Sequence, residues 1–135
     1  MAIFQWSDKY SVKVKELDDQ HKKLVALLNE LHDGMSSGKS KEAMAVVLDG
    51  LVKYTVSHFA NEEQYMSRLK YPGELAHKAE HKKLVDQVAK FQKDYQNGQA
   101  ALSLEIMNFL KSWLTGHIQN TDMKYSQFFN DKGIK

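Results

Sequence analysis

Two pairs of residues in the chain have the type and spacing of metal ligands on a helix. His58 and Glu62 lie four residues apart, and so do His77 and His81. Residues four apart on an α-helix differ by only about 40° around the helix axis, so both members of a pair point to one spot. Imidazole and carboxylate groups are common ligands for transition metals. The spacing therefore predicts a metal-binding cassette that is used twice.

Three more residues of ligand type complete the set: His21, His117 and Asp122. Of the six histidines in the chain, only His32 falls outside this pattern. Cysteine is absent, which excludes disulfides, zinc-thiolate sites and iron-sulfur clusters. Any bound metal must therefore be held by nitrogen and oxygen.

The length and charge of the chain limit its class. A chain of 135 residues is long enough for one domain with its own core, so we predict a single domain over residues 1–135. The net charge is +2, and the lysines are spread along the chain, which argues against nucleic acid or a membrane as a partner. The first residues have neither a basic start nor a long apolar run. We expect a cytoplasmic protein.

Apolar residues recur at helical spacing in four stretches. The first runs from Asp18, the expected N-cap, to Gly34, and the second runs from near Ser40 to the Tyr71-Pro72-Gly73 break. The third ends at Asn97-Gly98, and the fourth runs from Leu102 towards Gly133. Short connections favour an all-α, antiparallel up-down four-helix bundle over residues 18–131, with residues 1–17 as an extended N-terminal arm.

The ligand-type residues fall on the stripes of these helices that should face the core. In the fourth helix the inward stripe contains Leu102, Ile106, Phe109, Leu110, Trp113, Leu114, His117 and Ile118. A single histidine on an apolar face is usually a hydrogen-bonded core residue. Burying an unpaired carboxylate costs several kcal/mol, so several inward histidines together with Glu62 and Asp122 require a cation.

The chain contains an internal repeat. Residues 20–25 (QHKKLV) recur almost unchanged as residues 80–85 (EHKKLV). His58 and Glu62 are echoed by His117 and Asp122, so the chain reads as two helical hairpins built on one plan. Two similar half-sites predict two metal ions with Glu62 and Asp122 bridging them. His77 has no counterpart, so one metal gains a third histidine and the other keeps an open position for a small molecule.

The spacing of the last pair departs from the pattern. His117 and Asp122 lie five residues apart, which corresponds to about 140° on an ideal helix. This segment needs a local bulge or a widened turn to point both side chains to one place. Gly116, directly before His117, would ease such a distortion.

With these motifs in place, the chain resembles the hemerythrins, and among them the single-domain bacteriohemerythrins. The likeness covers nearly the whole sequence. It includes Trp6, residues 18–21 (DDQH), residues 58–63 (HFANEE), Tyr71-Pro72 followed by His77 and His81, and residues 113–118 (WLTGHI) followed by Asp122.

The resemblance implies a role for each ligand position. His77, His81 and His117 would hold one iron ion, and His21 and His58 would hold the other. Glu62 and Asp122 would bridge the two Fe²⁺/Fe³⁺ ions together with an oxo or hydroxo group. The residues that match the family's apolar oxygen pocket are Leu24, Phe59, Trp113, Leu114 and Ile118.

The implied function is reversible binding of dioxygen for storage, transport or scavenging, by a monomer that is not an enzyme. The diferric form would bind small anions. Iron comes from the resemblance, because the spacing alone also permits zinc, copper or nickel. The alternatives are a di-iron enzyme that handles peroxide or nitric oxide, an oxygen- or redox-sensing module, and a metal-free structural bundle.

Three residues near the ligands receive other expectations. Helix geometry points Glu63 and Glu80 away from the cluster, so we expect them to be solvated. Glu80 or Gln20 could alternatively orient a neighbouring ligand. Residues 124–135, which include Tyr125, are expected to cap the end of the bundle.

Overall fold

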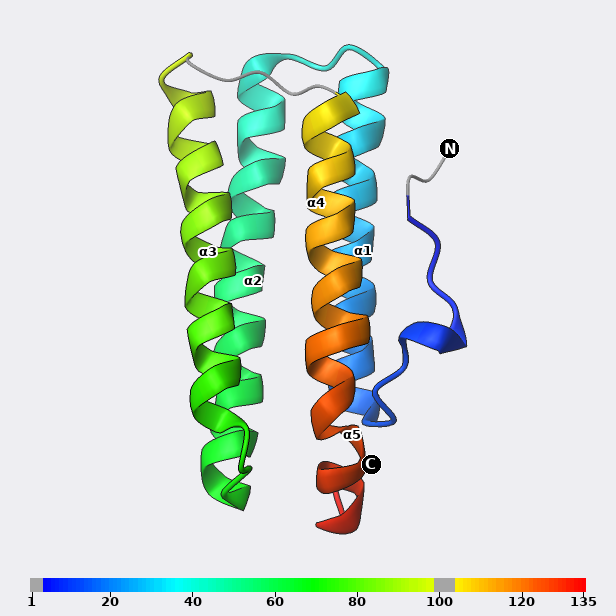
Figure 1. Cartoon of the computed structure of the whole chain (residues 1–135). Coiled ribbons are helices and arrows are strands. Elements are labelled where there is room, and N and C mark those ends of the chain that lie inside the picture. The colour runs from blue at the N-terminus through cyan, green and yellow to red at the C-terminus, as the bar shows by residue number, and fades with distance from the viewer. Residues whose placement is uncertain (1–3, 99–103) are drawn as a thin grey trace.

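The computed structural model describes residues 4–98 and 104–135, which form helices joined by short connections (Figure 1). The long helices are α1 (Lys15–Ser36), α2 (Lys41–Leu69), α3 (Glu74–Gln96) and α4 (Leu104–Gly116). A 3-10 helix, η1 (Asp8–Tyr10), precedes them. The last helix continues from α4 through the π-helical segment η2 (His117–Asp122) into α5 (Met123–Asp131).

Successive helices run in opposite directions, and α4, η2 and α5 together form the fourth rod (Figure 1). α1 packs against α2 and α4, while α2 packs against α3. This is the predicted antiparallel up-down four-helix bundle, and the all-α fold class is confirmed. Among residues 4–98 and 104–135, no helix is both long enough and apolar enough to span a bilayer.

Most predicted helix boundaries are close to the observed ones. Ser40 caps α2, because its hydroxyl oxygen accepts a hydrogen bond from the Ala43 N–H at 3.1 Å. Lys70 ends α2 in the left-handed conformation, with φ of 56°, directly before the Tyr71-Pro72-Gly73 break. α3 ends at Gln96, next to the predicted stop at Asn97-Gly98.

The predicted N-cap role of Asp18 is wrong. α1 begins at Lys15, after Val14, so Asp18 already lies in the first turn of the helix. Its carboxylate turns back to the arm, where it accepts hydrogen bonds from the Val12 N–H at 2.8 Å and the Ser11 hydroxyl at 2.6 Å. The carboxylate therefore ties the arm to the positive end of α1.

The expected N-terminal arm lies on the bundle. Phe4, Tyr10, Val12 and Val14 are buried, and the Phe4 and Tyr10 rings lie 4.9 Å apart. Asn29 of α1 fixes the start of the arm, because its side-chain amide accepts from the Phe4 N–H at 3.0 Å and donates to the Phe4 carbonyl at 2.8 Å.

Two apolar clusters fill the bundle. The larger one contains Leu24, Leu28, Leu48, Phe59, Val88, Leu110, Leu114 and Ile118, among others. The smaller one contains Val12, Val14, Leu17, Met66, Tyr125 and Phe129, at the end of the bundle that α5 closes (Figure 1). Burial of Tyr125 and Phe129 agrees with the expected capping of this end.

One member of the predicted inward stripe on the fourth helix is wrongly assigned. Phe109 is 44% exposed, whereas Met107, two residues earlier, is fully buried. The inward face follows Met107, Leu110 and Leu114. Successive residues lie about 100° apart around the helix axis, so Phe109, one residue before Leu110, lies on the outside. Leu102, which the same stripe included, lies outside the described residues.

We predict that Asp18→Ala lowers the free energy of unfolding by about 1–2 kcal/mol, because the Val12 N–H and the Ser11 hydroxyl lose their acceptor. Urea denaturation followed by far-UV circular dichroism measures this change. Asp19→Ala is the matched control, since the hydrogen bond of Asp19 is to the exposed Lys15 ammonium group at 2.7 Å and its loss should leave the unfolding curve unchanged. Equal effects of the two substitutions would contradict the anchoring role of Asp18.

Candidate metal centre

The seven predicted ligand residues meet inside the bundle, and all of them are buried. They form two groups in which the possible ligand atoms lie within 4.8 Å of one another. Both groups share Glu62 and Asp122. The first group adds His77, His81 and His117, and the second adds His21 and His58.

The three-histidine group is built by α3 together with η2. His77 and His81 lie one turn apart on α3 and face the interior. The Nε2 atoms of His77 and His117 each lie 2.9 Å from Oδ1 of Asp122. Nε2 of His81 lies 3.2 Å from Oε1 of Glu62. Each of the three imidazoles thus lies directly against one of the two carboxylates.

The two-histidine group is built by α1 and α2. Nε2 of His21 lies 3.0 Å from Oδ2 of Asp122 and 3.5 Å from Oε2 of Glu62. Nε2 of His58 lies 3.4 Å from the same Glu62 oxygen. Each carboxylate therefore has one oxygen towards the three-histidine group and the other towards the two-histidine group.

The widened turn that the five-residue spacing predicts is present. Residues His117–Asp122 form a π-helical segment, and both His117 and Asp122 are buried on the inward side. A π-turn holds one more residue than an α-turn, so it brings side chains five apart onto one face. Gly116 has an ordinary helical φ of −62°, and a Cβ atom there would meet nothing within 4 Å, so the distortion does not require glycine at this position.

Several buried polar atoms at the centre lie close to one another, yet none of them makes a well-formed hydrogen bond within the described residues. These are Nε2 of His21, His58, His81 and His117, Oε1 of Glu62 and Oδ2 of Asp122. Unpaired buried polar atoms are rare in proteins because each one costs free energy. All of these atoms are good ligands for a divalent transition metal, and they converge from four helices. The residues present therefore fit a metal centre with nitrogen and oxygen ligands.

The carboxylates at the centre are ionised. Burial by itself raises the pKa of Glu62, but the charge of His58 and the nearby imidazoles of His21 and His81 outweigh this effect and hold the pKa well below its usual value. For Asp122, burial and the charge of Glu62 raise the pKa, but the opposite effect of His117 and His21 is larger. The pKa of Asp122 is therefore also well below its usual value. Two negative charges therefore lie side by side in a region without solvent.

The same carboxylates act on two of the histidines. Burial lowers the pKa of His21, but Asp122 and Glu62 together raise it to about 10. Burial also lowers the pKa of His117, and the charge of Asp122 and hydrogen bonds raise it to about 9. In the metal-free protein these imidazoles hold protons at neutral pH. Bound metal cations would take over the task of balancing the carboxylates.

The outer nitrogens of three histidines also have partners. Nδ1 of His58 lies 2.6 Å from the Gln20 side-chain oxygen, and Nδ1 of His117 lies 3.1 Å from the Glu80 carboxylate. Nδ1 of His81 lies 2.8 Å from the Glu63 carboxylate. Such hydrogen bonds fix the ring and leave Nε2 free for a metal.

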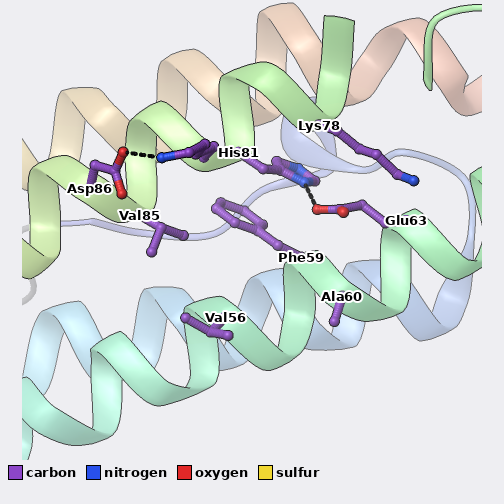
Figure 2. A pocket seen from close by; sticks show the side chains of 9 residues that line it. Val56, Phe59, Ala60, Glu63, Lys78, His81, Val85 and Asp86 are labelled. Atoms are coloured by element: carbon purple, nitrogen blue, oxygen red, sulfur yellow. Dashed lines mark hydrogen bonds and ion pairs between the residues drawn. The ribbon is translucent and has the colours of Figure 1, made fainter. Parts of the chain in front are cut away.

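The expectation that Glu63 is simply solvated is wrong, and so is the same expectation for Glu80. Both glutamates lie beside the ligands in sequence, which suggests an outward direction, but their side chains are long enough to reach a histidine on the neighbouring helix. Figure 2 shows Glu63 bonded to His81 across the gap between α2 and α3. The alternative orienting role that we consider for Glu80 and Gln20 fits the observed contacts.

Sequence reasoning also missed Tyr125 as a residue of the centre. Its side chain is fully buried, its hydroxyl donates a hydrogen bond to Oε2 of Glu62, and its ring stacks 5.6 Å from that of His77. The sequence does contain a signal for this role: Tyr125 continues the inward stripe of the fourth helix, because Ile118, Asp122 and Tyr125 follow helical spacing. Burial raises the pKa of the Tyr125 hydroxyl well above its ordinary value, so it remains a donor.

The five residues predicted for the apolar pocket all lie buried in the larger apolar cluster: Leu24, Phe59, Trp113, Leu114 and Ile118. Phe59 lies at the boundary between this cluster and the ligands. Its ring stacks flat on His81 at 3.8 Å, lies 5.3 Å from His117 and lies 6.5 Å from Trp113.

A surface hollow of about 320 Å³ lies between α2 and α3, outside this boundary (Figure 2). Phe59, His81 and Glu63 form its inner wall, and Lys78, Lys82 and Asp86 lie around it. The hollow therefore brings solvent up to the Glu63 carboxylate but leaves the ring of His81 buried.

Comparisons with known proteins agree with this geometry. Residues 12–129 match the family model described as the hemerythrin HHE cation-binding domain. A bacteriohemerythrin of Methylococcus capsulatus is 37% identical over 126 residues, which cover 93% of this chain and 95% of that protein. A bacteriohemerythrin of Pseudomonas aeruginosa is 37% identical over 125 residues, which cover 93% of this chain and 80% of that protein. A crystal structure of wild-type hemerythrin is 35% identical and superposes with a TM-score of 0.88 over 93% of this chain and 97% of the other.

We predict that the chelator-treated, metal-free protein loses stability as the pH rises from 7 to 10. The pKa of His21 rises from 6.5 in the unfolded chain to about 10 in the folded protein. Protonated His21 therefore adds its full contribution to the free energy of unfolding below pH 6.5, and this contribution disappears as the pH passes about 10. One pKa unit corresponds to about 1.4 kcal/mol, so we expect a loss of at least that size in urea denaturation. The metal-loaded protein is the control and should show a flatter profile. A metal-free protein that is equally stable at both pH values would contradict the protonated state of His21 and His117.

Proposed function

Because the chain belongs to the hemerythrin family of cation-binding domains, we propose that it is a di-iron protein that binds dioxygen reversibly. The observation that carries this proposal is the convergence of five histidines on two shared, fully buried carboxylates. Storage, transport or scavenging of oxygen would follow from such binding. We propose an oxygen-binding role for the monomeric chain and no catalytic one.

The ligand assignment follows the two groups of side chains. We assign one iron to His77, His81 and His117, and the other to His21 and His58. Glu62 and Asp122 would bridge the two ions, which is supported by their place in both groups. The second position has one protein ligand fewer, so it is the place where dioxygen, or a small anion in the diferric form, would bind.

The iron ions would supply the electrons that dioxygen accepts on binding, and the protein controls what surrounds them. Glu62 and Asp122 are fully buried and would offset part of the positive charge of the two ions. The Tyr125 hydroxyl holds one oxygen of Glu62 in place. Gln20, Glu63 and Glu80 hold the outer nitrogens of three imidazoles and so keep the rings facing the centre.

The apolar residues favour binding over cleavage of dioxygen. Leu24, Phe59, Leu114 and Ile118 are hydrocarbon, and the Trp113 indole does not titrate near neutral pH. None of these five side chains can supply protons to break the bond between the oxygen atoms. Their close packing would also exclude water and anions that compete for the open position.

The direct test of the proposed function is the visible spectrum of iron-loaded protein, first reduced under anaerobic conditions and then exposed to air. We expect a colourless reduced form, a pink-violet form in air, and return of the colourless form under vacuum, with two iron ions per chain. Direct conversion to a stable yellow diferric form would contradict reversible binding. That outcome would favour a peroxide-handling, nitric-oxide-handling or sensing role instead.

We further predict that Leu114→Ala speeds the loss of the oxygenated form. Leu114 is 3% exposed and packs in the larger cluster, so its truncation opens space through which water and anions reach the centre. The decay of the pink-violet colour in air measures the rate. Val46→Ala is the control, because Val46 is exposed and its loss should leave the rate unchanged. An unaltered decay rate in Leu114→Ala would remove Leu114 from the pocket.

A further inference from the structure

The hydrogen bonds behind the ligand histidines differ between the two metal positions. In the three-histidine group, His81 and His117 each face a carboxylate, at 2.8 Å and 3.1 Å. In the two-histidine group, His58 faces the neutral amide of Gln20 at 2.6 Å. Nδ1 of His21 is buried and has no acceptor within the described residues. One group is therefore supported by two negative charges and the other by none.

The internal repeat shows that this difference occurs at equivalent positions. Gln20 precedes His21 just as Glu80 precedes His81. Each of these two side chains then crosses to the histidine of the following helix, over sequence separations of 38 and 37 residues. The same interaction is thus made twice, once by an amide and once by a carboxylate, and the carboxylate of Glu80 also accepts a hydrogen bond from the Thr121 hydroxyl.

The second outer carboxylate, that of Glu63, also has no counterpart in the other half-site. Glu63 comes directly after Glu62 and binds His81. The equivalent position after Asp122 is Met123, whose thioether cannot accept a strong hydrogen bond. Nδ1 of His21, the counterpart of His81, is buried without an acceptor among the described residues. Both outer carboxylates are therefore absent from one half-site and present in the other.

A carboxylate behind an imidazole strengthens it as a metal ligand more than an amide does. The Nδ1–H donates to a negatively charged oxygen, which draws the proton away and leaves Nε2 more electron-rich. Loss of such a partner typically weakens metal binding by about 10-fold to 100-fold.

We propose that Glu63 and Glu80 are positioning residues that make the three-histidine position the tighter of the two metal positions, and that Gln20 keeps the other position weaker. This inference rests on the proposed ligand set and is independent of dioxygen. The position with the open site would then be the one that loses its metal first.

Stepwise binding of cobalt(II) to the chelator-treated full chain, in competition with a chromophoric chelator, gives two dissociation constants and tests the proposal. We expect the wild-type constants to differ. Glu80→Gln keeps the shape and the contact to Thr121 but removes the charge, and should weaken the tighter step by about 10-fold or more. Gln20→Glu adds the missing carboxylate, and should tighten the weaker step by a similar factor.

Asp86→Asn is the matched control, because it removes a carboxylate from the same helix, where Asp86 accepts a hydrogen bond from the exposed Lys82 at 2.9 Å. It should leave both constants within about twofold of wild type. The inference would be overturned if the ratio of the two dissociation constants in both Glu80→Gln and Gln20→Glu equals the wild-type ratio while circular dichroism shows intact helices. That outcome would not contradict the proposed metal centre. Cobalt uptake that His81→Ala does not reduce would overturn the proposed metal centre together with the inference.

Discussion

Two fully buried carboxylates at the middle of the bundle govern the structure around them. Glu62 and Asp122 have no exposed surface, and each lies within 3.5 Å of imidazole nitrogens. Burying an ionised carboxylate without compensation costs several kcal/mol, and two in one place repel each other as well. Imidazoles from every rod of the bundle therefore converge on them, with Tyr125 adding a hydroxyl. The interior accepts this pair only with positive charge beside it, carried by imidazolium or by metal cations.

Much of this arrangement follows from helical periodicity. Residues three or four apart share a face, so the positions of His58, Glu62, His77 and His81 predict which side of each helix faces the centre. The unusual spacing of His117 and Asp122 predicts a widened turn, and the structure has a π-helical segment at those residues. The roles of individual ligands stay predictions, because they come from the resemblance to a family. The choice of iron has the same source, since no periodicity distinguishes one divalent metal from another.

The errors have a common physical origin. Periodicity describes one helix at a time, whereas the missed contacts cross between elements. Glu63 reaches His81 on the next helix, Tyr125 reaches Glu62 on another, and Asp18 reaches back to the arm. Whether a long side chain makes such a contact depends on the distance and rotation of the neighbouring helix, which the spacing along one chain segment does not contain. Phe109 shows the complementary limit, since a shift of one residue moves a side chain from the core to the surface.

The polar centre divides the apolar interior into two parts. Along α1 the order is Leu17, His21, Leu24, so a predicted ligand separates a residue of the smaller cluster from one of the larger. Along the fourth rod, Asp122 likewise separates Ile118 from Tyr125. Apolar packing on both sides of the centre holds the helices together through contacts that do not depend on the charge between the carboxylates. The helices that carry the predicted ligands therefore have apolar contacts of their own on both sides of the centre. A site held in this way can keep its geometry while the charge at its centre changes, which is what repeated binding and release of dioxygen would require.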